Sequence, residues 1–511
     1  MVSNKTTHQR VTKHERKRTT SDVHDGIEYN KKLRKINKEF LEKVTPPPSP
    51  SDAMKASDGG GNEPDVVPSD PACDPEHPKK ICFSDVSSAA FSIKNGIIRT
   101  PCNRSSNFCK MLDMELYFKK EYLQVTGSFK ERGARYALSR LSKEEKEIGV
   151  IAASAGNHAL ALSYHGQQLK IPVTVVMPVV APLMKIGMCR SYGANVILKG
   201  DNIGQARLHA MKLVAEKKYK YINGYDHPDI LAGQGTIGLE ILEQVPDVDA
   251  IIVPVGGAGL IAGIAVAVKT LKPQVQVIAV ESDTCPSYTE AIKAGKPVLV
   301  SVRSTLADGL AVPMVGGNAL ATLDGIVDKS LVVCEETTAL SILRLIEMEK
   351  AVVEGGGAVG VAALISGQLP ELRGKKVVTI LTGGNIDTTV LGRTIERGLA
   401  VDSRLIRLEV VVSDRPGGIA ELASQVAHMG ASIKDIFHER AWIATDVFSV
   451  RVSYIHISFY NPQLGNPIFC LGTPMKVSIR RQSTMHLNLK EVKLQGKIEQ
   501  KETCHITRRA K

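Results

Sequence analysis

The chain has 511 residues, of which 43% are hydrophobic, 5% are aromatic and 43 are glycine, so it is long enough for more than one folded core and suits an α/β enzyme better than an all-β module. The net charge of +12 invites a nucleic-acid-binding function, yet residues 1–43 contribute +6, residues 473–511 contribute +7, and the stretch between them is close to neutral at −1. The positive charge is therefore confined to the two ends of the chain. The part between them is not basic, and the two ends differ from it in composition.

Residues 1–85 are predicted to be disordered. Their first half is rich in Lys, Arg and Thr, and a Pro-, Gly- and Asp-rich stretch with few large apolar side chains follows it. Such a segment buries too little apolar surface to offset the entropy that is lost on ordering. The prediction places the start of the folded body near residue 86.

Residues 86–400 alternate short β-branched runs with Ala- and Leu-rich amphipathic stretches. Apolar strands separated by helices indicate parallel sheets that are covered on both faces. We expect two open parallel-sheet subdomains, the smaller over about residues 149–226, with functional residues at the C-terminal ends of the strands. The clearest strand-like runs are residues 150–154, 173–178, 195–200, 250–257, 275–281 and 377–384.

Two motifs in the first half of this region present a lysine and an asparagine. Lys130 lies in TGSFKERGA, where a helical pattern begins, and a helix N-terminus favours the neutral amine that can form a Schiff base. Asn157 lies in SAGNHA after a strand, where its amide can donate to a phenolic oxygen and nearby N–H groups can bind an anion. Each motif alone is also consistent with a surface lysine or an ordinary strand–helix turn.

Two further motifs follow later strands. GGAGL, residues 256–260, opens a helix, so its successive N–H groups can form a nest for a phosphate, although it lacks the Lys and Ser/Thr of a P-loop. TGGN, residues 382–385, places the Thr382 hydroxyl at a strand end. In this order the four motifs supply the lysine, the amide donor, the phosphate nest and the hydroxyl that hold pyridoxal phosphate.

Residues 405–454 form a second predicted unit. A strand at 405–412, a DRPGG turn, apolar residues at helical spacing and two more strand-like segments give a small βαββ arrangement. The pattern fails after about Tyr454, where YNPQLGNPIFCLGTP contains several helix breakers. Residues 455–511 are therefore expected to be an irregular basic tail.

The nine cysteines are scattered, without a CxxC pair or a His/Cys cluster at zinc-ligand spacing. This pattern disfavours a disulfide scaffold and a structural metal, and reduced thiols favour the cytoplasm. The N-terminus lacks the apolar core of a signal peptide. The long uncharged run at 250–268 contains Pro254 and four glycines, so strand, turn and helix are predicted there rather than a membrane span.

On these motifs, residues 86–400 closely resemble the fold-type II pyridoxal-phosphate enzymes, with the fold of tryptophan synthase β, and most of all the threonine/serine dehydratase branch, the threonine ammonia-lyases, which includes serine racemase. Residues 405–454 resemble the first half of an α+β ACT regulatory domain, truncated here. The resemblance implies pyridoxal phosphate as cofactor and conversion of L-threonine to 2-oxobutyrate, or of L-serine to pyruvate, with release of ammonia. It also implies a homo-oligomer, dimer or tetramer, and an amino-acid effector at the DRPGG turn.

The resemblance assigns a role to each motif residue. Lys130 is bonded to the cofactor and becomes the general base for the Cα proton once the substrate amine displaces it. The ring is flanked by Phe129, its phenolic oxygen is bound by Asn157, and its nitrogen faces Thr382, where the family commonly has serine. The substrate carboxylate is held by Ser154 and His158. The phosphate is cradled by Gly256, Gly257, Ala258, Gly259 and Leu260, with Ala258 in place of the family's usual glycine.

Ala155 separates dehydration from racemisation in this comparison. The racemases resembled here have SSGN, whose second serine is the acid/base on the opposite face, whereas Ala155 cannot transfer a proton. Glu281 fits the carboxylate of the racemase cation site, but Ser287 stands about where a second acidic ligand is expected. Both departures favour elimination, and no metal is predicted.

Alternative functions stay open at this point. One is a serine racemase-like or β-replacement enzyme on the same fold, and another is a catalytically idle protein that binds pyridoxal phosphate or regulates other proteins. Nucleic-acid binding by the basic ends is disfavoured, because they lack interleaved aromatic residues and any RNA- or DNA-binding signature. The preference for threonine or serine depends on the shape of the side-chain pocket.

Overall fold

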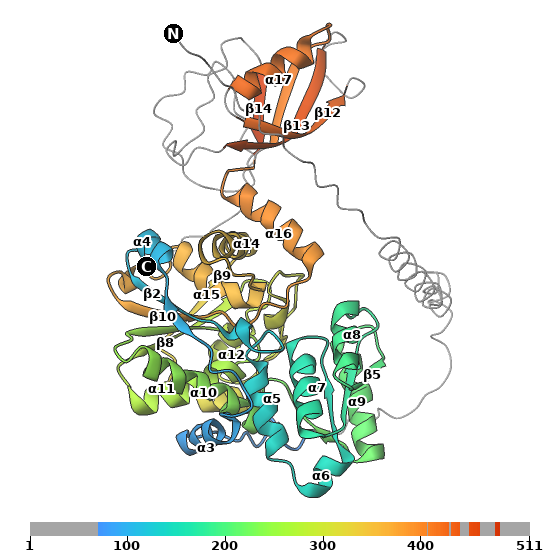
Figure 1. Cartoon of the computed structure of the whole chain (residues 1–511), viewed down its shortest axis with the longest axis vertical. Coiled ribbons are helices and arrows are strands. Elements are labelled where there is room, and N and C mark those ends of the chain that lie inside the picture. Colours follow the sequence, from blue (N-terminus) through green and yellow to red (C-terminus); the bar gives the residue numbers. More distant parts are fainter. Residues whose placement is uncertain (1–69, 406, 429–430, 440–448, 460–475, 481–511) are drawn as a thin grey trace, which may run out of the picture. The chain divides into compact units, whose positions relative to one another are not determined.

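Two α/β subdomains make up the main body of the computed structural model (Figure 1), which describes residues 70–405, 407–428, 431–439, 449–459 and 476–480. The larger sheet has the strand order β1-β2-β10-β7-β8-β9 and is parallel except for β1, which pairs antiparallel with β2. The smaller sheet is parallel throughout, in the order β5-β4-β3-β6. The two predicted parallel-sheet subdomains are confirmed.

The elements of the body alternate along the chain much as the hydrophobic pattern predicts. The strands are β1 (Cys102–Arg104), β2 (Glu115–Lys119), β3 (Val150–Ala153), β4 (Val173–Met177), β5 (Asn195–Leu198), β6 (Lys220–Tyr221), β7 (Ala250–Pro254), β8 (Gln276–Ser282), β9 (Lys329–Val333) and β10 (Lys376–Ile380). The α-helices are α3 (Phe83–Ile93), α4 (Ser106–Leu112), α5 (Lys130–Ser139), α6 (Lys143–Ile148), α7 (Asn157–Leu169), α8 (Leu183–Ser191), α9 (Ile203–Lys217), α10 (Pro228–Gln244), α11 (Gly259–Leu271), α12 (Ser287–Ala294), α13 (Gly317–Leu323), α14 (Glu335–Arg344), α15 (Gly355–Ile365) and α16 (Thr388–Val401). Short helical turns lie at η1 (Glu121–Leu123), η2 (Asp308–Leu310), η3 (Leu345–Glu349) and η4 (Pro370–Leu372).

Alternate residues of the central strands pack into two different cores. In β7, Ile251 and Val253 belong to a core that includes α10, α11 and α13, whereas Ala250 and Ile252 belong to a core that includes α14 and α15. Because helices cover both faces of the sheet, the strands are apolar on both sides. This double coverage is the reason that the strands appear in the sequence as continuous apolar runs.

Glycines bring α5, which begins at Lys130, into close contact with α10. A Cβ atom on Gly233 of α10 would lie only 2.6 Å from the Cα atom of Gly133 of α5. A Cβ atom on Gly235 would likewise lie 2.7 Å from the carbonyl oxygen of Gly263 in α11. These crossings leave no room for larger residues, so they fix the axis of α5 on the body.

The predicted disordered segment extends too far along the chain. The backbone N–H of Lys79 donates to Asn318 Oδ1 at 2.6 Å, and Ile81 N–H donates to Thr322 Oγ1 at 3.2 Å. Ile81 also lies in the core, and α3 begins two residues later. Residues 70–85 are thus folded onto side chains of α13, a partner that the local composition does not reveal. Residues 1–69 lie outside the described residues.

The C-terminal sheet is antiparallel, with the order β12-β13-β11-β14. Its elements are β11 (Arg407–Ser413), α17 (Gly418–His428), β12 (Ala431–Glu439), β13 (Ser449–Phe459) and β14 (Lys476–Arg480). The predicted strand, helix and two strands are present, but the boundary near Tyr454 is wrong because β13 continues past it and β14 lies in the predicted irregular tail. β14 pairs with the edge of β11 that β13 leaves free, and a five-residue strand is hard to recognise before its partner edge is known.

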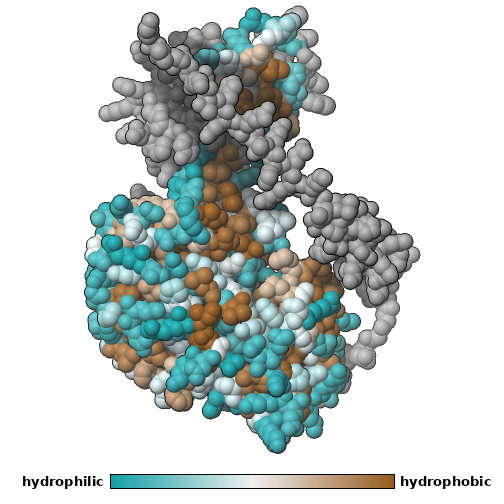
Figure 2. Space-filling view, viewed as in Figure 1, coloured by the Kyte–Doolittle hydropathy of each residue, from teal (hydrophilic) through white to brown (hydrophobic). Residues whose placement is uncertain are grey.

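Within the described ranges, the structure has no helix long and apolar enough to cross a membrane. The apolar run at 250–268 folds as β7, a glycine turn and the first part of α11, as predicted. On the face of the body in Figure 2, hydrophilic and hydrophobic residues are interspersed.

Candidate active site

Lys130 is the first residue of α5, as predicted, and the loop before it is held by the loop after β10. The N–H of Phe129 donates to the Thr382 carbonyl at 3.0 Å, and Ser128 forms an antiparallel bridge with Gly383. The N–H of Gly384 donates to the Gly127 carbonyl at 3.0 Å. Two motifs that lie far apart in the sequence therefore form one backbone unit.

The Lys130 amine is half-buried in this unit. Its Nζ donates to the Gly224 carbonyl at 2.5 Å and lies 5.0 Å from the centroid of the Phe129 ring. Burial lowers the pKa of Lys130 to about 8, against an opposing effect of the Glu354 charge. An appreciable share of the amine is therefore neutral near neutral pH, as a nucleophile or a base requires.

Asn157 lies at the centre of a chain of polar contacts. Its Nδ2 donates to Glu354 Oε1 at 2.7 Å, and its Oδ1 accepts from Asn385 Nδ2 at 2.9 Å. Asn385 also donates to the carbonyl of Thr126 at 2.7 Å. The SAGNHA, TGSFK and TGGN motifs thus meet at one place, and the second amide hydrogen of Asn157 stays available for a ligand.

Glu354 is the main functional candidate that the sequence interpretation missed. It caps α15, its carboxylate is buried at 5% exposure, and its backbone N–H donates to Gly383 O at 3.0 Å. Burial raises the pKa of Glu354 to about 7, with a further contribution from Asp308, while Lys185 and Asn157 oppose the shift. An acidic residue inside the apolar, glycine-rich VVEGGGAVG segment was the available signal.

Ser154 directly follows β3 and His158 lies in the first turn of α7, and their side chains have different hydrogen-bond partners. His158 is buried, and its Nε2 bonds to the Ile222 carbonyl at 3.0 Å while its Nδ1 has no partner. Burial, and then the charge of Lys130, lowers the pKa of His158 to about 3, so the ring is neutral and Nδ1 is an acceptor. Ser154 Oγ accepts from Gly156 N–H at 3.3 Å. Of the two, the Ser154 hydroxyl is better suited to donate to a carboxylate, and both roles stay predictions.

The GGAGL loop lies against the segment that contacts Lys130. α11 begins at Gly259, and side chains at Gly257 or Gly259 would collide with Tyr225, the neighbour of Gly224. The N–H groups of a helix start without side chains above them form a cradle for an anion. The cradle, the amine with a lowered pKa and the unpartnered buried Ser128 Oγ and His158 Nδ1 fit the predicted pyridoxal phosphate.

Ala258, where the family usually has glycine, adopts a left-handed conformation, with φ +68° and ψ −2°. Such a conformation costs an L-residue about 1–2 kcal/mol, whereas glycine adopts it freely but loses about 0.5–1 kcal/mol through its more flexible unfolded chain. We expect Ala258→Gly to raise the free energy of unfolding by up to about 1 kcal/mol, measured by urea denaturation.

Ala262→Gly is the matched control, because Ala262 is a buried residue inside α11. There the same change should lower stability by about 1 kcal/mol. Equal destabilisation by both substitutions would show that the conformation of Ala258 is not strained.

The remaining sequence-predicted positions are placed as follows. Thr382 is buried two residues after the end of β10, and its hydroxyl contact with the ring nitrogen stays a prediction. The Glu281 carboxylate accepts from Tyr288 N–H at 2.7 Å and from Thr289 N–H and Oγ1 at 2.8 and 2.6 Å. The described residues contain no group of three His, Cys, Asp or Glu side chains that could hold a metal ion.

Comparisons with known proteins agree with this geometry. The family model described as "Pyridoxal-phosphate dependent enzyme" matches residues 93–383. An L-threonine ammonia-lyase of Thermotoga maritima is 42% identical over 361 residues, which cover 71% of this chain and 90% of that protein. A catabolic L-threonine dehydratase of Staphylococcus aureus is 40% identical over 326 residues, which cover 63% of this chain and 94% of that protein.

Solved structures of similar enzymes also match this chain. The processed form of threonine deaminase isoform 2 from Solanum lycopersicum matches with a TM-score of 0.59 and 33% identity, over 63% of this chain and 95% of that chain. Serine racemase from Dictyostelium discoideum matches with a TM-score of 0.57 and 33% identity, over 60% of this chain and 99% of that chain. The predicted fold class is confirmed.

Proposed function

Because this chain belongs to the family of pyridoxal-phosphate dependent enzymes, we propose that it is a threonine ammonia-lyase, which converts L-threonine to 2-oxobutyrate and ammonia. The observation that supports this function most directly is the position of Lys130. Its amine, with a pKa lowered to about 8, lies in one bonded unit with the Asn157 and Thr382 motifs and beside the GGAGL cradle. The proposal also extends to L-serine, with pyruvate as product.

The bound cofactor supplies an electron-withdrawing ring that stabilises negative charge developing on the substrate Cα. The N–H groups of residues 256–260 would bind the phosphate, and the free amide hydrogen of Asn157 would bind the ring oxygen. Thr382 offers a neutral hydroxyl to the ring nitrogen. Lys130 in its amine form would take the Cα proton, and the protonated amine or solvent would return one proton to the β-hydroxyl, which leaves as water. The enamine that is formed would tautomerise to the imine, and water would hydrolyse the imine to the 2-oxo acid and ammonia.

Racemisation is the second candidate, because serine racemases are among the structural neighbours. A racemase needs a proton donor on the face opposite the lysine. The SAGN loop has Ala155 where the resembled racemases have serine, and alanine has no exchangeable side-chain proton. Elimination is therefore the function that we propose.

A product assay on the purified protein with pyridoxal phosphate tests both candidates. We expect 2-oxobutyrate from L-threonine, a smaller yield of pyruvate from L-serine, and no D-serine by chiral chromatography. A visible absorption band of the bound cofactor should accompany the activity. Formation of D-serine without 2-oxo acid would favour the racemase, and a cofactor-loaded protein without any product would contradict both.

We also propose that residues 407–480 form an ACT-like regulatory unit of a cytoplasmic homo-oligomer, either a dimer or a tetramer. In support, β11, α17, β12 and β13 follow the βαββ order, and β14 completes the sheet order β12-β13-β11-β14. The DRPGG turn between β11 and α17 is the proposed effector site. Titration of the activity with isoleucine, serine or glycine tests this site, and light scattering tests the oligomer.

A further inference from the structure

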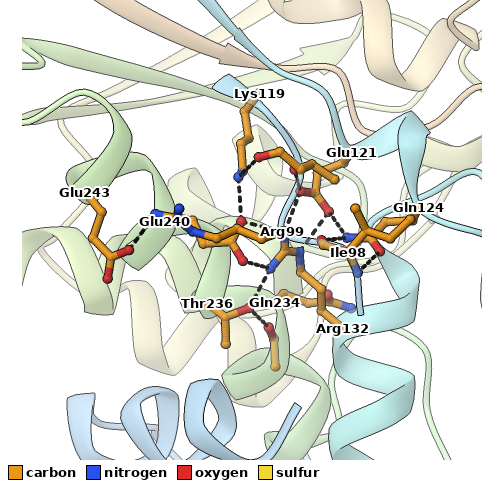
Figure 3. Close-up of polar contacts among 12 residues, drawn as sticks. Ile98, Arg99, Lys119, Glu121, Gln124, Arg132, Gln234, Thr236, Glu240 and Glu243 are labelled. Carbon is orange, nitrogen blue, oxygen red and sulfur yellow. Dashed lines mark hydrogen bonds and ion pairs between the residues drawn. The ribbon is translucent and has the colours of Figure 1, made fainter. Parts of the chain in front are cut away.

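A buried cluster of four charged side chains includes one residue of the first turn of α5 (Figure 3). Its members are Lys119 at the end of β2, Glu121 in η1, Arg132 in α5 and Glu240 in α10. The side chains of Lys119, Arg132 and Glu121 have no exposed surface, and Glu240 is 14% exposed. The two positive and two negative side chains pair with one another. Four charged side chains buried together are rare in protein interiors, where Lys, Glu and Arg are almost never fully buried unless they are paired.

Arg132 is held between the two carboxylates. Its Nε and Nη2 donate to Glu121 at 2.8 and 2.7 Å, and its Nη1 and Nη2 donate to Glu240 at 2.7 and 2.9 Å. A fifth bond runs from Nη1 to Thr236 Oγ1 at 3.2 Å. All five donors of the guanidinium are therefore used, and two paired bonds on each of two sides leave the side chain a single orientation.

The partners of Arg132 are themselves held in place. Lys119 Nζ donates to Glu240 at 2.5 Å and to the Thr100 carbonyl at 2.7 Å, and Glu121 accepts from Thr100 Oγ1 at 2.5 Å. Burial alone would raise the pKa of Glu121, but the Arg132 guanidinium holds it below its ordinary value. The Glu121 carboxylate is thus held in its charged form, and the hydrogen bonds of the cluster tie α5 to β2, η1 and α10.

The same elements also hold the Thr382 loop. The N–H of Leu381 donates to the Lys119 carbonyl at 2.9 Å, and the N–H of Tyr122 donates to the Leu381 carbonyl at 3.2 Å. Lys119 and the residue after Glu121 therefore hold the backbone that precedes Thr382, while Arg132 lies two residues after Lys130. The cluster therefore connects the segment that carries Lys130 with the loop that carries Thr382, and the proposed mechanism requires a fixed distance between these two residues.

We propose that Arg132, through its paired bonds to Glu121 and Glu240, is a positioning residue that fixes Lys130 relative to the Thr382 loop. This inference rests on the proposed function, in which Lys130 takes the Cα proton. A lysine at position 132 keeps the charge but presents no planar fork, so it cannot satisfy both carboxylates in one orientation. Displacement of a catalytic group by a fraction of an ångström affects the chemical step more than substrate binding.

Arg132→Lys in the full-length holoenzyme tests the proposal. We expect kcat for L-threonine to fall at least about tenfold while KM changes by less than about threefold. The visible circular dichroism of the bound cofactor should lose at least about half of its intensity, because the cofactor loses its fixed orientation.

Arg344→Lys is the matched control. Arg344, on α14, also donates to two carboxylates, Glu347 at 3.0 Å and Asp402 at 2.5 Å, and is not a member of the cluster. Because the Arg344 side chain is 24% exposed, this variant should lower the melting temperature by less than Arg132→Lys does. It should leave kcat and the circular dichroism within about twofold of the wild type.

A melting temperature that falls in Arg132→Lys without a change in kcat or circular dichroism would overturn the proposal, and so would an effect confined to KM. If Arg132→Lys does not fold, Glu240→Gln carries the test, with the same split between kcat and KM expected and an unchanged kcat contradicting it. Absence of 2-oxo acid from the wild type would overturn the proposed function, and this inference with it. Product from the wild type together with a normal Arg132→Lys variant would overturn this inference alone.

Discussion

Lys130→Ala is expected to reduce formation of 2-oxobutyrate by at least about 10³-fold and to abolish the visible absorption band of the bound cofactor. The structure places this amine at the start of α5, where its Nζ donates to Gly224 O at 2.5 Å. Burial lowers the pKa of Lys130 to about 8. Alanine removes both the proposed proton acceptor and the proposed covalent attachment to the cofactor. The measurements are initial rates with L-threonine and absorbance after dialysis.

Lys143→Ala controls for the loss of a positive charge. Lys143 begins α6 and is exposed, so its variant should keep the wild-type rate and spectrum within about twofold. A Lys130→Ala enzyme with more than about a tenth of the wild-type rate would contradict the assignment of Lys130 as the base.

Glu354→Ala is expected to reduce kcat/KM by about tenfold to a hundredfold. The substitution leaves Asn157 Nδ2 without its 2.7 Å partner, and an unsatisfied buried amide costs about 1–3 kcal/mol. Asn157 also accepts from Asn385, so the loss affects both loops of the site. Steady-state kinetics with L-threonine measures the effect.

Glu354→Gln is the informative partner variant, because the glutamine oxygen can still accept from Asn157. It should retain much more activity than Glu354→Ala. The Glu354 charge raises the pKa of Lys130, so its removal should shift the acidic limb of the pH–rate profile to lower pH. Equal loss of activity in both variants, without a shift of the profile, would show that Asn157 does not depend on this carboxyl group.

The raised pKa of Glu354 should also make the free energy of unfolding depend on pH. The pKa of Glu354 is about 7 in the folded protein and about 4.5 in the unfolded chain, so the folded state holds the extra proton between these values. Wild-type stability should therefore fall by up to about 3 kcal/mol as the pH rises through this window. Glu354→Gln should lack this fall, which urea denaturation at pH 5 and pH 8 would measure.

The sequence predicted those elements whose residues form a recognisable pattern within one short segment. The strands β3, β4 and β8 were predicted to within one residue at each end, because buried parallel strands are apolar on both faces. The predicted C-terminal ends of β7 and β10 lie three and four residues too late. Lys130, Asn157 and the GGAGL loop were found because helix starts and glycine turns leave recognisable motifs. Residues 70–85 and β14 were missed, because they are ordered by α13 and β11, which lie far along the chain.

The sequence by itself determined the α/β class and the cofactor and predicted the residues that contact the cofactor, because each prediction follows from a contiguous motif with its own backbone geometry. Only the tertiary structure decided which groups set the chemistry of Lys130. Glu354, Gly224 and the Arg132 cluster come from separate elements, and burial is the largest cause of the shifted pKa values of Glu354 and His158. Desolvation and long-range hydrogen bonds depend on what packs nearby, which no single stretch of sequence contains.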